Sequence, residues 1–212
     1  VKVNGITVVA ERAIKPGQKD FTAEIGALKA AGATHIMLTV LPSATGPILG
    51  TAAKMQYMPI WLANTPAWVD AFFAHPKLPA VVFKNFYWMS GLPFWGETVP
   101  GMSTFLAAYN EFGKTMYKPD FYLLTSYIQG RVAIEALNRA IKAKDLSRAG
   151  YMTALRSIDN FDLGGMIKPI SLKAFPYVTA TQTRVLRPDF DKKTWNIVAP
   201  YANPTKAALP VS

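Results

Sequence analysis

The stretch HIMLTVLPSATGP, residues 35–47, decides the fold class of this chain. Residues 35–41 are an almost unbroken apolar run, which is typical of a strand covered on both faces in a parallel sheet. Residues 42–47 then turn the chain into a helix that the pattern continues through Lys54. A buried strand followed at once by a helix predicts a strand–helix unit of the α/β type.

The same alternation continues on both sides of this stretch. Residues 5–10 are a β-branched run of strand length, and Asp20 is a good N-cap for a helix that ends at Gly32. Residues 58–63 read as a third strand. Strands and helices at this spacing indicate βαβ units, so the fold class is α/β with a Rossmann-like parallel sheet.

The second half of the chain has a different pattern. A strand is predicted within residues 80–88, and a passage rich in Gly and Pro, residues 91–101, is the expected domain crossing. Further helices are predicted at residues 103–112, 122–144 and 147–158, the second with an apolar stripe of Leu124, Ile128, Val132 and Leu137. Extended segments are expected at residues 177–183 and 195–198.

Composition excludes several classes of function. The chain has 212 residues, half of them apolar, with a net charge of +10, no Cys and two His. A disulfide scaffold, a thiolate metal site and a Cys nucleophile are therefore excluded, and a multi-histidine metal centre is not expected. The basic residues are spread along the chain rather than gathered into a stripe, so we expect no nucleic-acid partner. No apolar run approaches the roughly 20 residues of a membrane span.

Catalytic motifs are missing, and polar residues instead follow the predicted strands. The chain has no Gly-x-Ser-x-Gly, phosphate-loop, Gly-x-Gly-x-x-Gly or His-Glu-x-x-His pattern. Ligands of open parallel sheets bind beyond the carboxyl ends of the strands. The residues at those ends are Thr39, Leu41, Pro42 and Ser43 after one strand, and Asn64, Thr65 and Trp68 after the next. Such residues also populate ordinary loops.

The order of features resembles a known family, the type 1 periplasmic (solute-)binding proteins of the branched-chain amino acid receptor group. The resemblance covers about residues 5–200 and rests on short motifs in a fixed order. They are Gly17-x-x-Asp20-Phe21-Thr22, Leu28-Lys29-Ala30-Ala31-Gly32-Ala33, Pro59-Ile60-Trp61, Tyr127-Ile128-Gln129-Gly130, Asp145-Leu146-Ser147-Arg148 and Phe161-Asp162-Leu163-Gly164-Gly165.

The resemblance implies two Rossmann-like lobes joined by crossover strands. Residues 1–90 then correspond to the main part of the second lobe, residues 91–177 to the C-terminal part of the first lobe, and residues 178–212 to the return into the second. The first lobe is expected to be incomplete, so the sequence reads as a C-terminal fragment. The chain begins with Val1 rather than Met, which we expect of a processed or truncated product.

The resemblance also implies a function. The chain is expected to be the extracytoplasmic solute-binding component of a bacterial ABC importer, a monomer without cofactor or metal, and not an enzyme. Its partners would be a small-molecule ligand and a membrane permease. Ligand contacts are expected from residues 41–43 and 64–66, and from Tyr122, which matches an aromatic residue of the first lobe.

The class of ligand depends on the loop after residue 63. In amino-acid binders of the family an acidic side chain here pairs with the ammonium group of the ligand, but the matching residue is Thr65. A neutral hydroxyl cannot balance a buried ammonium, so we expect an aromatic or aliphatic carboxylate or an amide. Asp70 could take the acidic role if the loop shifts, which would keep an amino acid as ligand.

Two other functions remain open at this point. The same fold serves as a ligand-sensing module of signalling or regulatory systems. A metabolic α/β enzyme with a Rossmann-like domain is the other alternative, although the phosphate-loop glycines are missing.

Overall fold

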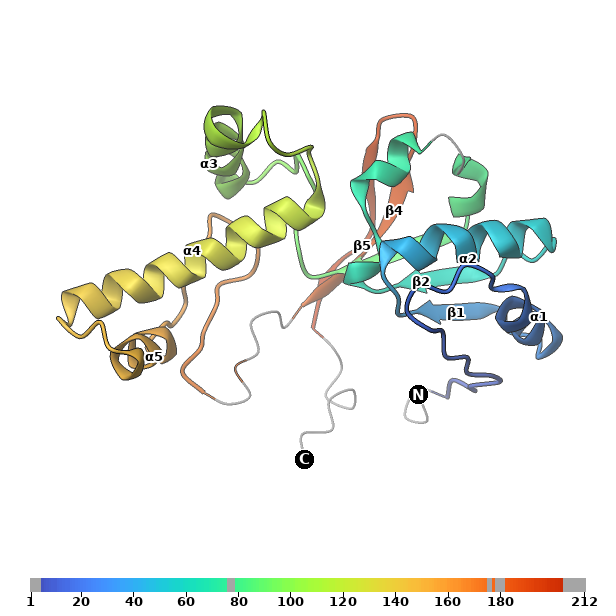
Figure 1. Cartoon of the computed structure of the whole chain (residues 1–212), viewed down its shortest axis with the longest axis horizontal. Helices are drawn as coiled ribbons and strands as arrows, with labels where there is room; N and C mark the ends of the chain where they lie inside the picture. Colours follow the sequence, from blue (N-terminus) through green and yellow to red (C-terminus); the bar gives the residue numbers. More distant parts are fainter. Residues whose placement is uncertain (1–4, 76–78, 175–176, 178–181, 204–212) are drawn as a thin grey trace. The chain divides into compact units, whose positions relative to one another are not determined.

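A computed structural model describes residues 5–75, 79–174, 177 and 182–203, and it contains both helices and a sheet (Figure 1). The helices are α1 (Thr22–Ala30), α2 (Pro42–Lys54), α3 (Pro100–Ala108), α4 (Phe121–Lys142) and α5 (Arg148–Arg156). The strands are β1 (His35–Leu38), β2 (Ile60–Ala63), β3 (Phe86–Ser90), β4 (Thr183–Asp189) and β5 (Thr194–Ala202). The chain divides into two compact units, Val1–Ser90 with Thr183–Ser212 (unit 1) and Gly91–Gln182 (unit 2).

Unit 1 is built on a five-stranded sheet in the order β1-β2-β3-β4-β5. Strands β1, β2 and β3 are parallel, which confirms the predicted α/β class with its parallel sheet. The two later strands are antiparallel, β4 to β3 and β5 to β4. Parallel neighbours place their carboxyl ends at one edge, and the register aligns Leu38 with Ala63 and Ala63 with Trp88.

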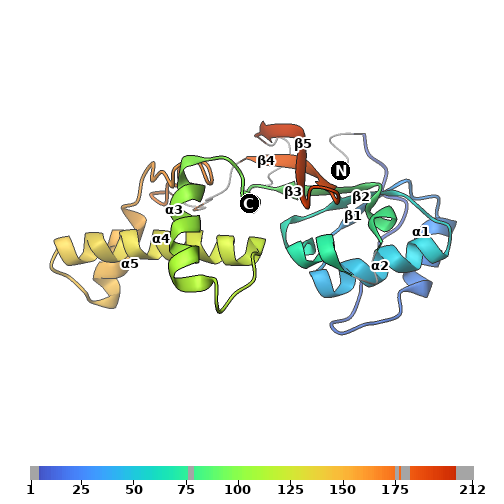
Figure 2. The same ribbon diagram turned by 90° about the horizontal axis from the view of Figure 1, so that it is seen from above.

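One face of this sheet carries the core of unit 1. Ile36, Trp61 and Phe86 are buried, and helix α2 runs along one side of the sheet (Figure 2). On β1 the alternate side chain, Met37, is 63% exposed, so the expectation that this strand is covered on both faces is wrong for the described residues. A continuous apolar run does not reveal how many layers cover a strand, because that depends on which other elements pack there.

The predicted strand at residues 5–10 is also wrong. These residues have no strand conformation, and Ile6 and Val8 are 62% and 60% exposed. A strand is stable only when a neighbour completes its hydrogen-bond ladder, and among the described residues none pairs with this run. The expected strand within residues 80–88 is shorter than predicted, because Ala80–Phe83 forms a 3₁₀ helix, η4, before β3. Of the extended segment at 177–183, residues 178–181 lie outside the described residues.

Unit 2 is held together by a separate helical core. Leu124 and Ile128 of α4 are buried together with Phe105 of α3 and with Ile158 and Met166 of the segment that follows α5. The predicted cap of α5 is confirmed, since Ser147 Oγ accepts a hydrogen bond of 3.0 Å from the Gly150 N–H. A side-chain cap satisfies a backbone donor that the first helical turn leaves without a partner.

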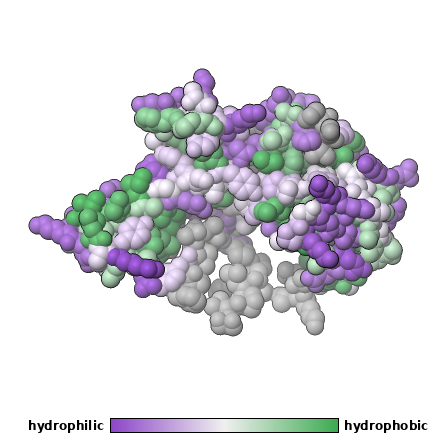
Figure 3. Space-filling model, viewed as in Figure 1, coloured by the Kyte–Doolittle hydropathy of each residue, from purple (hydrophilic) through white to green (hydrophobic). Residues whose placement is uncertain are grey.

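Helix α4 has a second apolar face that the described residues leave uncovered. Ile134, Leu137 and Ile141 are 54%, 44% and 53% exposed, and exposed apolar side chains gather on this part of unit 2 (Figure 3). Their spacing of three and four residues puts them on one side of the helix. Leu137 belongs to the apolar stripe seen in the sequence but is exposed, because α4 is apolar on two sides and periodicity alone does not say which one is packed.

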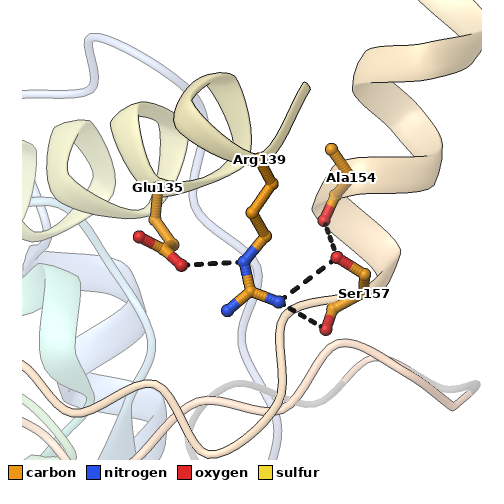
Figure 4. A network of polar contacts seen from close by, with 4 residues as sticks. All are labelled: Glu135, Arg139, Ala154 and Ser157. Atoms are coloured by element: carbon orange, nitrogen blue, oxygen red, sulfur yellow. Dashed lines mark hydrogen bonds and ion pairs between the residues drawn. The ribbon is translucent and has the colours of Figure 1, made fainter. Parts of the chain in front are cut away.

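A polar network fastens the end of α4 to the end of α5 (Figure 4). The Arg139 guanidinium lies 2.7 Å from Glu135 Oε1 and donates to the Ser157 carbonyl oxygen, also at 2.7 Å. The Ser157 hydroxyl in turn donates to the Ala154 carbonyl oxygen at 2.7 Å. Arg139 thus satisfies a carbonyl at the end of α5, where the helix itself offers no donor.

The stability of unit 2 is expected to fall in acid because of Asp159. Hydrogen bonds from Lys173 and from Ser171 hold the pKa of this carboxyl below its ordinary value of 3.8. A carboxyl whose pKa is lower in the folded state stabilises the fold above its unfolded pKa, and this contribution is lost as the pH falls through the folded pKa. Urea midpoints measured from about pH 6 to about pH 2 should therefore fall less steeply in Asp159→Asn than in the wild type.

The variant Lys173→Gln is the control for this effect. It keeps the carboxyl and removes its nearest cation, whose Nζ lies 2.8 Å from Asp159 Oδ2. Its pH slope should lie between those of the wild type and Asp159→Asn, because the hydrogen bond of 2.8 Å from Ser171 remains. Identical slopes in all three proteins would show that this carboxyl does not contribute to the acid sensitivity.

Candidate functional site

The carboxyl edge of the parallel strands is the candidate site of unit 1. Leu38 and Ala63 end β1 and β2 side by side, so Thr39 and Asn64 follow at the same edge. The Asn64 N–H donates to the Leu38 carbonyl oxygen at 3.2 Å, which ties the two strand ends together. The structure thus brings together two segments, residues 39–43 and 64–65, that the sequence analysis selected from separate loops.

The first of these segments leads into α2. Leu41 has extended backbone and is 62% exposed, Pro42 occupies the first turn of the helix, and Ser43 is exposed. Leu41 has no side-chain oxygen to cap the helix, and Pro42 has no N–H to satisfy. The positive end of the α2 dipole therefore lies beside Ser43, where it favours negative charge.

The second segment presents hydrogen-bond acceptors. The Thr65 hydroxyl donates to the Met89 carbonyl oxygen at 3.1 Å, so its proton is already used and the oxygen can only accept further bonds. Asn64 Oδ1 is buried and receives no hydrogen bond from any described residue. A buried acceptor without a donor is costly, and such groups are uncommon outside strained or functional sites.

Trp68 does not lie at the surface of this site. Its side chain is fully buried, and its indole N–H donates to Asp70 Oδ1 at 2.8 Å. Rings of Phe73 and Trp195 pack against it with centroids 4.9 and 4.5 Å away. A side chain enclosed in this way offers no flat surface to a ligand, so the structure does not support the prediction of a ligand contact and makes Trp68 part of the core.

Tyr122 lies in unit 2, at the start of α4, and is 38% exposed. The Asp120 carboxylate caps this helix by accepting a hydrogen bond of 2.7 Å from the Tyr122 N–H. Partial burial raises the pKa of the Tyr122 hydroxyl, and the charge of Asp120 raises it further. The phenol therefore keeps its proton at neutral pH and can donate a hydrogen bond.

The sequence analysis missed a groove that begins at Pro42 and Ser43 and runs along α2. It has a volume of about 580 Å³, and Gly50 and Lys54 of the helix, Lys19 from the loop before α1, and His75 also line it. The signal that could have found it is the series Ser43, Gly46 and Gly50, in which small residues repeat at helical spacing on one side of α2 before Lys54.

Metal-binding clusters and membrane-spanning helices are both absent from the part of the chain that the structure describes. No three side chains of His, Asp or Glu there come together in a way that could hold a metal ion. None of the helices there has the length and apolar character that crossing a membrane requires.

Comparison with solved structures identifies the fold. A fatty acid ABC transporter substrate-binding protein from Thermomonospora curvata is 23% identical, with a TM-score of 0.78 over 90% of this chain and 49% of that chain. A branched-chain amino acid ABC transporter structure from Thermus thermophilus with bound valine is 17% identical, with a TM-score of 0.71 over 89% and 50%. A substrate-binding periplasmic protein from Ralstonia solanacearum is 14% identical, with a TM-score of 0.77 over 94% and 54%.

The chain spans about half the length of each of these proteins. No curated protein sequence matches it. Residues 1–180, however, match the family described as periplasmic binding protein. Because that match covers most of the 212 residues, the chain belongs to the periplasmic binding protein family.

Proposed function

We propose that this protein is the extracytoplasmic solute-binding component of a bacterial ABC importer, and that it binds its ligand without catalysis. The observation that carries the proposal is the group of exposed or half-buried polar residues Thr39, Ser43, Asn64 and Thr65 at one sheet edge, in a chain of this family. Parallel α/β sheets bind their ligands at that edge. A membrane permease is the proposed partner of the ligand-bound form.

Binding is proposed to involve two lobes that close on the ligand. Unit 1 would be the main part of the second lobe, and unit 2 the C-terminal part of the first. The uncovered apolar face of α4, with Ile134 and Ile141, supports the assignment of unit 2 as part of a larger lobe, because such faces are normally buried. Ligand would stabilise the closed arrangement through its higher affinity for that state.

A substitution in the first turn of α2 tests the proposed site. Ser43→Trp places a bulky ring on an exposed position of the carboxyl edge, and it should weaken ligand binding at least about tenfold, which corresponds to about 1.4 kcal/mol. The ligand is first identified by mass spectrometry of the small molecules that co-purify with the native protein, and affinity is then measured by calorimetry.

The control is Ser103→Trp, because Ser103 is also an exposed serine near the start of a helix, α3, that begins with a Pro. It should leave the affinity unchanged. Thermal unfolding of both variants should match that of the wild type, because neither side chain is in a core. Wild-type affinity in Ser43→Trp would contradict the assignment of the carboxyl edge as the binding site.

The ligand is proposed to lack an essential ammonium group. The Thr65 hydroxyl is neutral and already donates to Met89, and Asp70 accepts the indole N–H of the buried Trp68. A desolvated ammonium without a carboxylate partner costs several kcal/mol. Calorimetry should therefore show tighter binding of carboxylates or amides than of leucine and valine. Tight binding of leucine or valine, with no detectable binding of acids and amides, would refute the proposal.

A further inference from the structure

The groove lies between helix α2 and the segment of Val69, Phe72 and His75 that follows β2. Thr45, Ile48 and Ala52 are buried in the core, and the groove is lined by Ser43, Gly46, Gly50 and Lys54, of which Gly46 is also buried. These positions are three or four residues apart, so they form one continuous strip along the helix. From Ser43 to Lys54 the strip is roughly 16 Å long at 1.5 Å per residue.

Part of the lining of the groove is apolar, namely Pro42, Pro47, Val69 and Phe72. A Cβ atom added to Gly50 would meet no atom within 4 Å, so the space above this residue is open. Val69 and Phe72, beside and within the 3₁₀ helix η3 (Asp70–Ala74), form part of the wall. An elongated apolar surface of this kind suits an extended hydrocarbon chain rather than a compact polar solute.

The charges around the groove have one sign. Its charged lining residues are Lys19 and Lys54, and among the described residues no Asp or Glu lines it. Lys19 and Lys54 form no ion pair with any described residue, and the positive end of the α2 dipole lies at the Pro42 end. The groove therefore combines apolar side chains with two lysines, which favours a ligand with an aliphatic chain and a negative head group.

We propose that this groove binds a linear aliphatic monocarboxylate along α2. The proposal goes beyond the solute-binding function above, because Gly50, Thr51 and Lys54 lie two to three turns away from the carboxyl edge of the sheet. The whole groove belongs to unit 1, so the chain of 212 residues is sufficient for the test.

Filling the groove tests its shape. Octanoate is the probe, titrated calorimetrically into the wild type and into Gly50→Leu, with octanol and octylammonium as uncharged and oppositely charged probes of the same length. Leucine is a far better helix former than glycine and has open space at this position, so Gly50→Leu should remain folded. It should weaken octanoate binding at least about tenfold, because the side chain occupies the groove.

Gly130→Leu is the matched control, because Gly130 is also a helical glycine with nothing within 4 Å of an added Cβ. It should bind octanoate as the wild type does. The proposal is overturned if octanoate does not bind, if octylammonium binds equally well, or if Gly50→Leu binds like the wild type.

Removing a cation tests the charge. Lys54→Gln should weaken octanoate binding about two- to fivefold, as expected for a solvent-exposed ion pair, and added salt should reduce the difference. Lys142→Gln is the control, because both lysines lie in the last turn of a helix and only Lys54 lines the groove. Equal effects of the two substitutions would overturn the proposed role of Lys54.

The two proposals fail separately. Loss of octanoate binding in Gly50→Leu with wild-type affinity for the co-purifying ligand would support the groove as a second site. An effect of Gly50→Leu together with no effect of Ser43→Trp on the co-purifying ligand would support the groove and refute the binding site at the carboxyl edge.

Discussion

Replacing Trp68 with alanine is expected to lower the free energy of unfolding of unit 1 by about 3–5 kcal/mol, the range for large aromatic residues in a core. The indole is fully buried, and the rings of Phe72, Phe86 and Trp195 lie 5.3, 5.7 and 4.5 Å from it. Its removal opens a cavity among these rings and takes away the N–H that donates to Asp70.

Because Trp68 contacts several strands, its replacement is expected to destabilise the whole of unit 1. Trp68 follows β2, Phe86 begins β3 and Trp195 lies in β5, so one side chain joins the parallel strands to the segment that returns after unit 2. Hydrogen exchange measured by mass spectrometry should therefore speed up throughout β1, β2 and β3, whereas peptides of α4 should keep their protection.

Val81→Ala is the control for this prediction, because Val81 is apolar, belongs to the same unit and is 60% exposed. It should change the free energy of unfolding by less than about 0.5 kcal/mol. A loss of stability in Trp68→Ala no larger than this would mean that the aromatic cluster does not hold unit 1 together.

Replacing Gly101 with alanine should destabilise unit 2 by about 1–3 kcal/mol, the range for overpacking in a core. An added Cβ would lie 2.1 Å from the Leu163 carbonyl oxygen and 2.6 Å from Met166 Cγ, and Met166 is buried. The Gly101 N–H donates to the Gly164 carbonyl oxygen at 2.8 Å, so the two backbones cannot separate without losing this bond.

Gly130→Ala provides the opposite result in the same unit. An added Cβ meets nothing within 4 Å, and alanine is favoured over glycine in a helix by about 1 kcal/mol. Urea unfolding followed by far-UV circular dichroism should therefore give a lower midpoint for Gly101→Ala and a higher midpoint for Gly130→Ala. Equal midpoints for the two variants would refute the close approach of α3 to the segment at Leu163.

The sequence predicted the elements whose signal is local. The cap at Ser147, the long helix α4 and strands β1 and β2 follow from residue type and spacing within a few turns, and the structure has each of them. The motif Phe161–Gly165 was identified instead by its resemblance to the family. Gly164 and Gly165 both have positive φ, 66° and 75°, a conformation that glycine adopts without strain.

Features that depend on a distant partner could not be predicted in this way. Residues 5–10 have a strand composition but no partner strand among the described residues, and Leu137 has the same apolar character as the buried Leu124. Trp68 reads as a loop aromatic until Phe86 and Trp195, distant in sequence, are seen to enclose it. Burial is a property of the packed chain, so residue type alone does not decide it.

The candidate site, too, was predicted in part from local sequence and decided in part by contacts between distant segments. The sequence by itself determined the βαβ order, and with it the rule that residues after parallel strands meet at one edge, which selected Thr39, Ser43 and Asn64. Only the tertiary structure decided that the Thr65 hydroxyl donates its proton to the Met89 carbonyl oxygen, and that Lys19 and Lys54 line one groove. Helical and strand periods fix which residues share a face, whereas packing between segments far apart in the chain fixes what that face meets.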